Sequence, residues 1–447
     1  MTSPVRESID FLFDLEQFGV KLGLDNIRLL RTALGQPDRS FKSIIVAGTN
    51  GKGSVAAMIE TALRAAGYTA GCYSSPHLMA LEERFAVGGR PIARETLTAE
   101  ADRLRATVER LLDDGRLPAP PTFFEATTAV ALSLFARAGV EAAVLEVGMG
   151  GRFDATNVVT PVAAAISSID LDHQQYLGAT LADIAYEKAG VIKPGAVVVT
   201  GETKPPALDV LRRVARERGA QLIEASRDVE IRAALRGGWT EVEMTTPVRR
   251  YGPLRLGLRG RHQVGNAAVA VRLLEGLHDC GLPVPPEAIL EGLGGVRWAG
   301  RLDVAAVDAR RSIVLDAAHN PAAVAAFATY VEEVWPGGVP LVFAALRDKD
   351  VKGMLSALGN AVKTIFCPPL ASPRALPPDT LLAEIRSARP DLRAAAAASP
   401  AAALDAAWRL GDVIGAAGST YLVGEIMSEL AARGETPRRT ETGQAPG

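Results

Sequence analysis

The sequence predicts an α/β protein of two domains, each built on a mainly parallel β-sheet. Short apolar runs bounded by glycine or proline alternate with helical patterns, a second such series follows a glycine-rich stretch, and the chain has 447 residues. Strands and helices in alternation place helices on both faces of a parallel sheet. A chain of this length exceeds what one hydrophobic core supports, so at least two domains are expected.

The first domain is predicted over residues 1–295. Its buried strands are expected in the apolar runs at 43–48, 142–148, 161–169 and 196–201. Helical patterns occupy 55–66, 98–113, 125–138 and 180–190, and helices return at 264–280 and 287–292. Residues 228–259 alternate apolar and polar side chains in short runs, which predicts a small antiparallel patch on the same domain.

A second, Rossmann-like α/β domain is expected over residues 296–432. Gly292 to Arg301 is rich in glycine and is predicted to be the hinge about which ATP closes the two domains. The α/β pattern beyond it consists of 312–320, 340–346, 364–369 and 419–425, with helices at 321–334 and 350–359. Residues 433–447 are polar and contain proline, so we expect a disordered tail there.

The composition excludes several classes of protein. A net charge of −2 gives no field for a polyanion, so neither nucleic acid nor an acidic membrane is expected as a partner. The three cysteines have no metal spacing and are expected to be reduced thiols. Acidic residues interrupt the N-terminal apolar runs, and no run of about 18 apolar residues occurs, so neither a signal peptide nor a membrane span is expected. A soluble cytoplasmic protein follows.

The stretch "VAGTNGKGSV", Val46 to Val55, joins the first predicted strand to the first predicted helix. Backbone N–H groups and the positive end of a helix face an anion in such a loop, and Lys52 adds a point charge. The spacing departs from the usual G-x-x-x-x-G-K-[ST] pattern, because the loop is shorter and Gly53 separates Lys52 from Ser54. A flexible turn without ligand is the alternative. We favour a phosphate cradle and hence a P-loop-type ATPase domain, because the lysine and the hydroxyl stand where phosphate and Mg²⁺ need them.

Polar residues follow three of the predicted strands, where ligands of open α/β sheets bind. They are Ser74, Ser75 and His77 after the strand at Tyr73, Glu146 after the second run, and Asp170, Asp172 and His173 after the third. A hydroxyl, a carboxylate and an imidazole from three strand ends can share one Mg²⁺, although this ion normally takes oxygen ligands. Taken alone, a histidine such as His173 is more often a hydrogen-bonded structural residue than a metal ligand. Glu146 lies in apolar surroundings, and a buried carboxylate needs a partner such as a metal.

Lys188, in "YEKAGVIKPG", lies near the end of a predicted helix. A salt bridge to Glu187, or exposure to solvent, would explain it. A buried lysine, by contrast, has a lowered pKa and a neutral amine that CO₂ can modify. The residues alone favour the salt bridge or exposure to solvent, and the spacing does not establish a modification.

Together these motifs resemble the folylpolyglutamate synthases, and most of all the bacterial bifunctional dihydrofolate synthase/folylpolyglutamate synthases of the Mur ligase superfamily. The resemblance runs from about residue 20 to 430 and rests on "AGTNGKGSV", "YSSPHL", "TFFEATT", "LEVGMGGRFDATN", "LDHQQYLGATLADIAYEKAGVIK", "DAAHNP" and "LRDKD". "SSPHL" together with "GGRFDATN" is the most specific combination. The last four residues of "LRDKD", Arg347 to Asp350, also fit ion pairs on the surface.

The resemblance implies an ATP-dependent amide ligation. A pterin-linked carboxylate attacks the γ-phosphate of ATP, and the amine of glutamate then displaces phosphate from the acyl phosphate. The implied cofactors are ATP and Mg²⁺, with two magnesium ions expected and K⁺ a further candidate. The implied partners are dihydropteroate, reduced folates and L-glutamate, and a monomer is the family default.

The resemblance also assigns residues. ATP would be held by Thr49, Asn50, Gly51, Lys52, Gly53, Ser54, Asn266, Arg301 and Asp316, and Mg²⁺ by Ser75, Glu146 and His173. Lys188 would be carbamylated, and Lys188, Lys52 and His319 would be catalytic. The pterin substrate would contact Lys21, Leu22, Gly23, Thr122, Phe123, Phe124, Glu125, Phe153, Asp154 and Ala155. Ala317 replaces a glycine of many relatives, so no positive φ is expected there.

Three rivals stay open at this point. The chain can be a folylpolyglutamate synthase only, another Mur-type amide ligase, or a regulator that binds ATP without catalysis. The short segment before the phosphate loop disfavours the Mur-type ligases that act on nucleotide sugars. Retention of Lys52, Glu146, His173 and Lys188 disfavours the regulator.

Overall fold

The computed structural model describes residues 4–19, 21–435 and 438–439, and the side chains are described for 9–19 and 21–435. The first sheet has eight strands in the order β4-β3-β2-β5-β1-β6-β7-β8. Its six parallel strands are β1 Lys42–Ala47, β2 Ala70–Tyr73, β5 Ala142–Glu146, β6 Ala163–Ile166, β7 Val197–Thr200 and β8 Gln221–Glu224. Two short antiparallel strands, β3 Phe85–Val87 and β4 Arg90–Pro91, close one edge. The predicted parallel sheet is thus confirmed.

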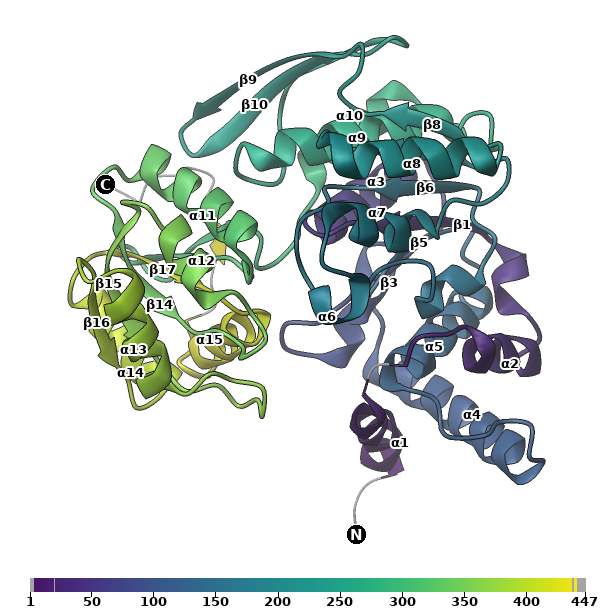
Figure 1. The fold of residues 1–447 in the computed structure, drawn as a ribbon, viewed down its shortest axis with the longest axis horizontal. Coiled ribbons are helices and arrows are strands. Elements are labelled where there is room, and N and C mark those ends of the chain that lie inside the picture. Colours follow the sequence, from purple (N-terminus) through teal and green to yellow (C-terminus); the bar gives the residue numbers. More distant parts are fainter. Residues whose placement is uncertain (1–3, 20, 436–437, 440–447) are drawn as a thin grey trace.

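Helices cover both faces of this sheet (Figure 1). One core lies between the sheet and α3 Lys52–Ala65, α9 His262–Gly276 and α10 Pro286–Gly295. The other face packs on α1 Pro4–Asp14, α2 Asp25–Ala33, α4 Arg94–Asp113, α5 Phe123–Arg137, α7 Leu181–Ala189 and α8 Pro205–Glu217. A short helix, α6 Gln174–Leu177, follows β6. Because β1 is covered on both sides, Ser43 to Ala47 are all buried, which explains the continuous apolar run.

The predicted antiparallel patch forms a separate sheet in the order β11-β10-β9. It contains β9 Glu230–Arg236, β10 Trp239–Thr245 and β11 Arg250–Arg255. Val242, Met244 and Tyr251 pack into the core of α3 and α9, so the patch belongs to the first domain. The β9–β10 hairpin extends from there toward the second domain, on the side of α11 (Figure 1).

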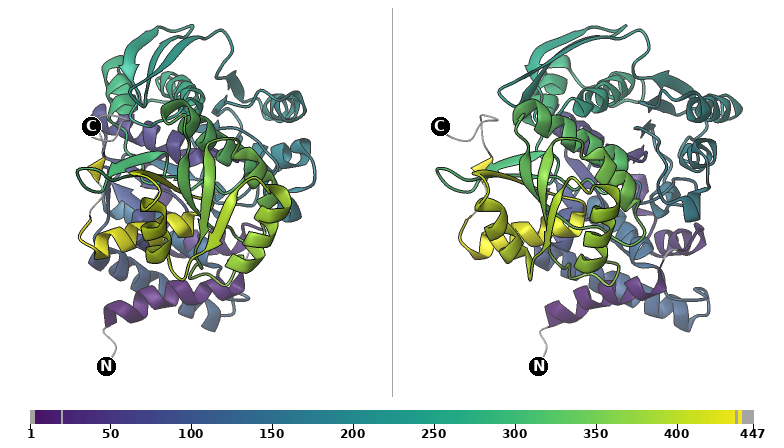
Figure 2. Two further views of the ribbon diagram at one scale, coloured as in Figure 1. Left: turned by 90° about the vertical axis from the view of Figure 1, so that its left-hand side faces the viewer. Right: turned by 60° about the vertical axis from the view of Figure 1, so that its left-hand side comes forward.

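The second domain has a seven-stranded sheet in the order β16-β15-β14-β17-β13-β12-β18. The parallel strands are β13 Ser312–Leu315, β14 Val339–Phe343, β15 Val362–Cys367, β16 Arg393–Ala396 and β17 Val413–Ala417, and the antiparallel edge is β12 Asp303–Ala306 and β18 Arg438–Arg439. One face is covered by α11 Pro321–Val334, α12 Val351–Ala357 and α13 Pro378–Ala388, and the other by α14 Pro400–Trp408 and α15 Thr420–Ala432. Figure 2 shows this domain from the side.

Three details differ from the sequence predictions. The predicted hinge starts too early, because Gly292 still lies in α10, where a Cβ atom would stand 2.6 Å from Ala62 of α3. The segment 419–425 is the N-cap and first turns of α15, and the strand before it is β17. Of the predicted tail, Glu435 accepts a hydrogen bond from Arg311 at 2.7 Å, and 436–437 and 440–447 lie outside the described residues. The domain boundary at 295/296 stays a prediction.

Candidate active site

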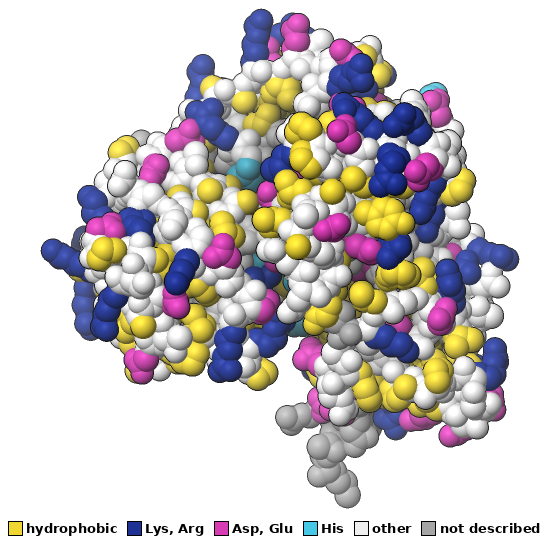
Figure 3. All heavy atoms as spheres, in the orientation of Figure 1, with side chains coloured by type: hydrophobic (Ala, Val, Ile, Leu, Met, Phe, Trp, Pro, Cys, Tyr) yellow, Lys and Arg dark blue, Asp and Glu magenta, His cyan; other side chains and the backbone are white. Residues whose placement is uncertain are grey.

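A cleft lies between the two domains, at the carboxyl ends of the central strands of the first sheet. The loop after β1, the ends of β2, β5 and β6, and the first turn of α9 form one wall. The linker at Arg301 and the segment from Asp316 into α11 form the other. In the space-filling view, histidine side chains are visible in the groove between the domains (Figure 3). Most of the residues predicted to hold ATP and metal therefore meet in one place.

The phosphate loop is shaped by two glycines. Gly48 has φ +140° and Gly51 has φ +86°, and a Cβ atom on them would stand 1.9 Å from Ser167 Oγ and 2.3 Å from Asn266 Oδ1. Any side chain at either position would therefore collide with its neighbour and strain the backbone. α3 starts directly after Gly51, so its N-terminus and free N–H groups face the cleft.

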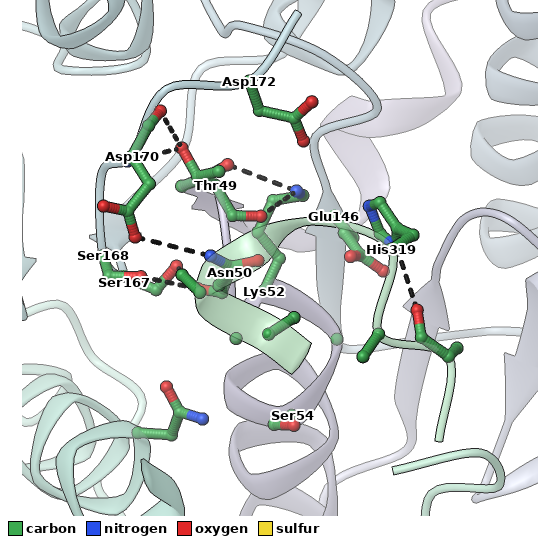
Figure 4. Close-up of a pocket in the computed structure, with 18 of the residues that line it drawn as sticks. Thr49, Asn50, Lys52, Ser54, Glu146, Ser167, Ser168, Asp170, Asp172 and His319 are labelled. Carbon is green, nitrogen blue, oxygen red and sulfur yellow. Dashed lines mark hydrogen bonds between the residues drawn. The ribbon is translucent and has the colours of Figure 1, made fainter. Parts of the chain in front are cut away.

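Thr49 is held by the segment after β6, and Lys52 is held by carbonyl groups of its own loop (Figure 4). Thr49 Oγ1 accepts a hydrogen bond from Asp170 N at 3.0 Å, and Thr49 N donates to Ser168 O at 2.7 Å. Lys52 Nζ donates to Gly48 O at 3.2 Å and to Thr49 O at 3.1 Å. Burial lowers the pKa of Lys52, and the nearby carboxylate of Glu146 opposes this shift. A cation and a ring of N–H groups thus face the same space.

Glu146 lies at the end of β5 and is 4% exposed. Its Oε2 accepts a hydrogen bond from Ser75 N at 3.3 Å. Burial raises the pKa of this carboxyl, while Lys52 and Arg301 lower it. A carboxylate at such a buried site is stabilised by nearby positive charge, and a divalent cation would supply it.

His173 is the third predicted metal ligand. It adopts a left-handed φ of 52°, and its Nε2 lies 3.8 Å from Asp172 Oδ2. Burial lowers the pKa of His173 to about 4, although Asp172 opposes the shift, so the imidazole is neutral and keeps a lone pair at neutral pH. Among the described residues no three His, Cys, Asp or Glu side chains are grouped as a metal site. The set of Ser75, Glu146 and His173 contains only two such residues and a hydroxyl, and its donor atoms fit a divalent cation that retains waters.

Lys188 points into the cleft from the end of α7. It is 3% exposed, and its Nζ donates to Gly48 O at 2.8 Å. Burial, together with the charge of Lys52, lowers the pKa of Lys188 to about 7. The proposed salt bridge to Glu187 is wrong, because Glu187 pairs with Arg152 at 2.8 Å instead, and the alternative of solvent exposure is wrong as well. The buried, partly neutral amine is the form that CO₂ can modify.

The second domain contributes Asp316 and His319. Asp316 Oδ2 accepts from Leu302 N at 2.7 Å and Oδ1 from Ala318 N at 2.8 Å, and burial raises the pKa of this carboxyl to about 6. His319 Nδ1 lies 2.9 Å from Ala317 O, and burial lowers its pKa to about 4. Ala317 has no positive φ, as expected. Asn266 and Arg301 line the same cleft, on opposite walls.

Two contacts across the cleft were missed by sequence reasoning. Asn320 Nδ2 donates to Asn50 Oδ1 at 2.8 Å, and Lys349 Nζ lies 2.9 Å from Asp172 Oδ1. The side chains of Lys349 and Asp172 are only 7% and 11% exposed. Burial raises the pKa of Asp172, but His173 and Lys349 outweigh it and bring the pKa to about 2. A surface ion pair is therefore the wrong interpretation of Lys349, although Asp348 does form one.

The residues predicted to bind the pterin do not line this cleft. Thr122 and Glu125 form the capping box of α5, with Glu125 N donating to Thr122 Oγ1 at 3.2 Å and Thr122 N to Glu125 Oε2 at 2.8 Å. Asp154 accepts from Met149 N at 3.0 Å and from Thr156 N at 3.0 Å. These polar side chains are engaged in holding local structure.

The other members of the set do not lie together. Phe124 packs against Gly148, where a Cβ atom would stand 2.7 Å from its ring, and Gly148 lines the cleft. Phe123 stacks on Phe13 at 5.8 Å between ring centres. Phe153 is 37% exposed, with the Arg152 guanidinium 4.3 Å from its ring centre. The remaining members are Lys21 and Leu22, which are exposed, Gly23, which is half-buried, and Ala155, which is buried.

Two families match the chain. The Mur ligase middle domain matches residues 46–274, and the Mur ligase glutamate ligase domain matches residues 300–420. Among curated relatives, the dihydrofolate synthase/folylpolyglutamate synthase of Bacillus subtilis is 38% identical over 80% of this chain and 84% of its own length. The protein of that name from Escherichia coli is 34% identical over 96% of both chains. This chain covers only 42% of a probable bifunctional folylpolyglutamate synthase/dihydropteroate synthase of Haloferax volcanii, to which it is 39% identical.

Solved structures agree with these matches. A Mycobacterium tuberculosis folylpolyglutamate synthase complexed with ADP superposes with a TM-score of 0.87 at 30% identity, over 96% of this chain and 99% of that one. Escherichia coli FolC in complex with DHPP and ADP gives 0.85 at 30% identity, over 97% and 99%. A bifunctional folylpolyglutamate synthase/dihydrofolate synthase of Yersinia pestis with Mn, AMPPNP and L-glutamate bound gives 0.80 at 32% identity, over 96% and 98%.

Proposed function

The chain belongs to the dihydrofolate synthase/folylpolyglutamate synthase family of Mur ligases and is an ATP-dependent ligase, and we propose that it joins L-glutamate both to dihydropteroate and to reduced folates. One observation carries the proposal. A phosphate loop, a buried carboxylate and a buried lysine from the first domain face His319 of the second across a single cleft. Family relatives of matching length carry both activities in their names.

The first step we propose is activation of the acceptor. A carboxylate oxygen of the pterin substrate attacks the γ-phosphorus of ATP, the bond to the β-phosphate oxygen breaks, and ADP leaves an acyl phosphate behind. Lys52 and the N–H groups at the start of α3 neutralise the charge that develops on the phosphate oxygens. Ser54, on the first turn of α3, offers its hydroxyl at the same end of the cleft.

The second step joins glutamate. Its amine attacks the acyl carbon, the bond between that carbon and the phosphate oxygen breaks, and the proton that the amine loses passes to the released phosphate. His319 is buried at the cleft and has a pKa of about 4, so it is neutral at pH 7 and able to accept a hydrogen bond. Its Nδ1 donates to Ala317 O, so we propose that Nε2 accepts from the incoming amine and orients it, and that Asn266, Arg301 and Asp316 hold the nucleotide.

Ser75, Glu146 and His173 would hold a divalent metal ion, which neutralises the negative charge of the phosphates when bound. Mn accompanies AMPPNP and L-glutamate in the Yersinia pestis structure, which supports a metal of this class. We propose Mg²⁺, with a second ion near Ser54 and K⁺ as a further candidate. A carbamate on Lys188 would add two oxygen donors to a set that otherwise has one carboxylate.

The remaining parts of the proposal concern partners. Reduced folates as second acceptor and a monomeric state follow from the family. Among the described residues, no helix is long and apolar enough to cross a membrane. The pterin is proposed to enter beside Phe124 and Gly148, since that ring packs against the cleft wall.

The rival with the strongest claim is a folylpolyglutamate synthase only, because Thr122, Glu125 and Asp154 are engaged in local bonds. The deciding experiment measures ADP release with ATP, Mg²⁺ and L-glutamate, and compares dihydropteroate with tetrahydrofolate. Turnover with both supports the bifunctional enzyme, and turnover with tetrahydrofolate alone supports the rival. If neither substrate turns over in folded protein that binds ATP, the proposed function is wrong.

A further inference from the structure

Helix α11 contacts the first domain at two points that lie far apart along its axis. At its N-cap, Asn320 Nδ2 donates to Asn50 Oδ1 of the phosphate loop at 2.8 Å. Near its other end, Tyr330 OH donates to Gly238 O of the β9–β10 hairpin at 3.0 Å. Ten residues of helix separate the two contacts, which is about 15 Å. The orientation of α11 over the cleft is therefore fixed by two distant contacts.

The second contact is built from buried groups, which we call the hairpin anchor: Gly238, Trp239, Arg259 and Tyr330. Arg259 Nη1 lies 3.2 Å from Gly238 O and 3.5 Å from Tyr330 OH. The guanidinium of Arg259 also lies 3.7 Å from the ring centre of Trp239. The side chains of Trp239, Arg259 and Tyr330 are 6%, 0% and 1% exposed. A cation over an aromatic ring contributes more when water is excluded, as here.

The hairpin turn brings the carbonyl to this place. Gly237 and Gly238 have φ of 54° and 73°, the conformation that a tight two-residue hairpin turn requires at both positions. Leu235, just before the turn, packs against the core of the second domain. The hairpin thus rises from the first domain and ends against α11 of the second, as Figure 1 shows.

The same chain segment connects the anchor to the phosphate loop. Arg261, two residues after Arg259, forms an ion pair with Glu333 of α11. Gln263 Nε2 then donates to Ser54 Oγ at 3.2 Å, and Asn266 lies against Gly51. Residues 259–266 therefore contact α11 at one end and the phosphate loop at the other.

We propose that the hairpin anchor positions α11, and through it His319 and Asn320, over the phosphates of ATP. Trp239, Arg259 and Tyr330 do not line the cleft, so they act through the helix and not on the substrate. The proposal rests on the proposed function only for its kinetic readout. Loss of the anchor should leave pterin binding intact and slow the steps that need α11 in place.

The test compares two buried tyrosines of the same region. Tyr330→Phe removes the hydroxyl that bonds to Gly238, whereas Tyr251→Phe removes a hydroxyl that bonds to Glu275 at 3.1 Å within the first domain. We expect kcat to fall about tenfold in Tyr330→Phe with either pterin substrate, while the KM for the pterin changes less than twofold. Tyr251→Phe should keep kcat within twofold. Equal losses of kcat in both variants, or no loss in Tyr330→Phe, would overturn the positioning role.

A second readout does not depend on glutamate ligation. Hydrogen exchange of the backbone amides of 322–326, which follow Pro321, is measured with AMPPNP bound, in wild type, Tyr330→Phe and Tyr251→Phe. We expect faster exchange there only in Tyr330→Phe, although the substitution lies at the opposite end of α11. Trp239→Phe serves as a second variant and should behave in the same way. If the exchange rate is unchanged in both Tyr330→Phe and Trp239→Phe, the positioning role is rejected, even if the ligase reaction is confirmed. If the wild type is inactive but exchange is faster in these two variants, only the proposed ligase function is rejected.

Discussion

The nucleotide side and the pterin side of the first domain are built in different ways. On the nucleotide side, Gly48 and Lys52 of the phosphate loop, Glu146 of β5 and Lys188 of α7 face one cleft. On the pterin side, Thr122 and Glu125 bond to each other, Asp154 accepts N–H groups of its own loop, and Phe153 lies on the surface. The first set turns its charges toward the cleft, whereas the polar atoms of Thr122, Glu125 and Asp154, which are also buried, form hydrogen bonds within their own local structure.

This difference reflects what the recognition of phosphate and the recognition of a pterin ring each require. Phosphate is recognised by backbone N–H groups and fixed charge, which a strand end and a helix start supply wherever they meet. A pterin ring is recognised by shape and stacking, so the residues need only lie along a surface. The comparison predicts large effects on catalysis from substitutions on the nucleotide side and small effects on KM from those on the pterin side.

The largest effect is expected for Lys52→Met, which removes the cation of the phosphate loop. Loss of one charge that stabilises the transition state costs on the order of 10² to 10³ in kcat. Lys42→Met is the matched control, because Lys42 Nζ donates to Cys280 O at 2.7 Å at the opposite end of β1. ADP release with saturating substrates measures both variants. If kcat fell no further in Lys52→Met than in Lys42→Met, the proposed difference between the nucleotide side and the pterin side would be wrong.

Lys188 should come next. Its pKa of about 7 means that the ammonium dominates at pH 6 and the neutral amine at pH 8, and only the amine reacts with CO₂. We expect a ¹³C carbamate signal after addition of labelled bicarbonate that grows as the pH rises from 6 to 8. Lys188→Ala should lose this signal, and activity should fall on the order of 10²-fold, as for other groups that support a metal site.

The control for that experiment is Lys193→Ala. Burial also lowers the pKa of Lys193, to about 8, but its Nζ lies 3.4 Å from Asn157 O, away from the cleft. It should keep both the signal and the activity. The role of the carbamate would be contradicted if the carbamate signal survived in Lys188→Ala. It would also be contradicted if a short carboxylate such as acetate failed to restore activity to that variant.

The sequence predicted the nucleotide side better than the interface between domains. Lys52 lies between a predicted strand and a predicted helix, and Glu146 lies near the end of a predicted strand, so their places in the cleft follow from the topology of a parallel sheet. The place of Lys188 was predicted from the family resemblance. The partner of Lys349 could not be predicted, because Asp172 is 177 residues away and only the packing of two domains brings them together. The role of the turn Gly237–Gly238 could not be predicted either, because it depends on Tyr330 of the second domain, which donates a hydrogen bond to Gly238 O. Local rules determine strand ends, whereas contacts between domains depend on the whole chain.

Lys349→Met tests this interdomain contact and should have a moderate effect. The substitution leaves the carboxylate of Asp172 buried without its cation, which costs about 3 to 5 kcal/mol in comparable pairs. We expect a lower free energy of unfolding in urea and about a tenfold loss of kcat. The double variant Lys349→Met/Asp172→Asn should recover part of the stability, because no charge is left unpaired. Lys352→Met, whose side chain is 68% exposed, is the control and should change neither quantity.

The smallest effects are expected from the phenylalanines of the pterin side, and they locate the pterin. The ring of Phe124 packs against Gly148 of the cleft wall, whereas Phe153 is exposed beneath Arg152. Aromatic contacts contribute about 0.5 to 1.5 kcal/mol beyond area, so Phe124→Leu should raise the KM for dihydropteroate about two- to tenfold and leave the KM for ATP unchanged. Phe153→Leu makes the same chemical change and should stay within twofold. If Phe153→Leu had the larger effect, the pterin would lie on the outer face beside Arg152. It would then bind by stacking on the exposed ring of Phe153, and not beside Phe124 at the cleft wall that also borders the nucleotide.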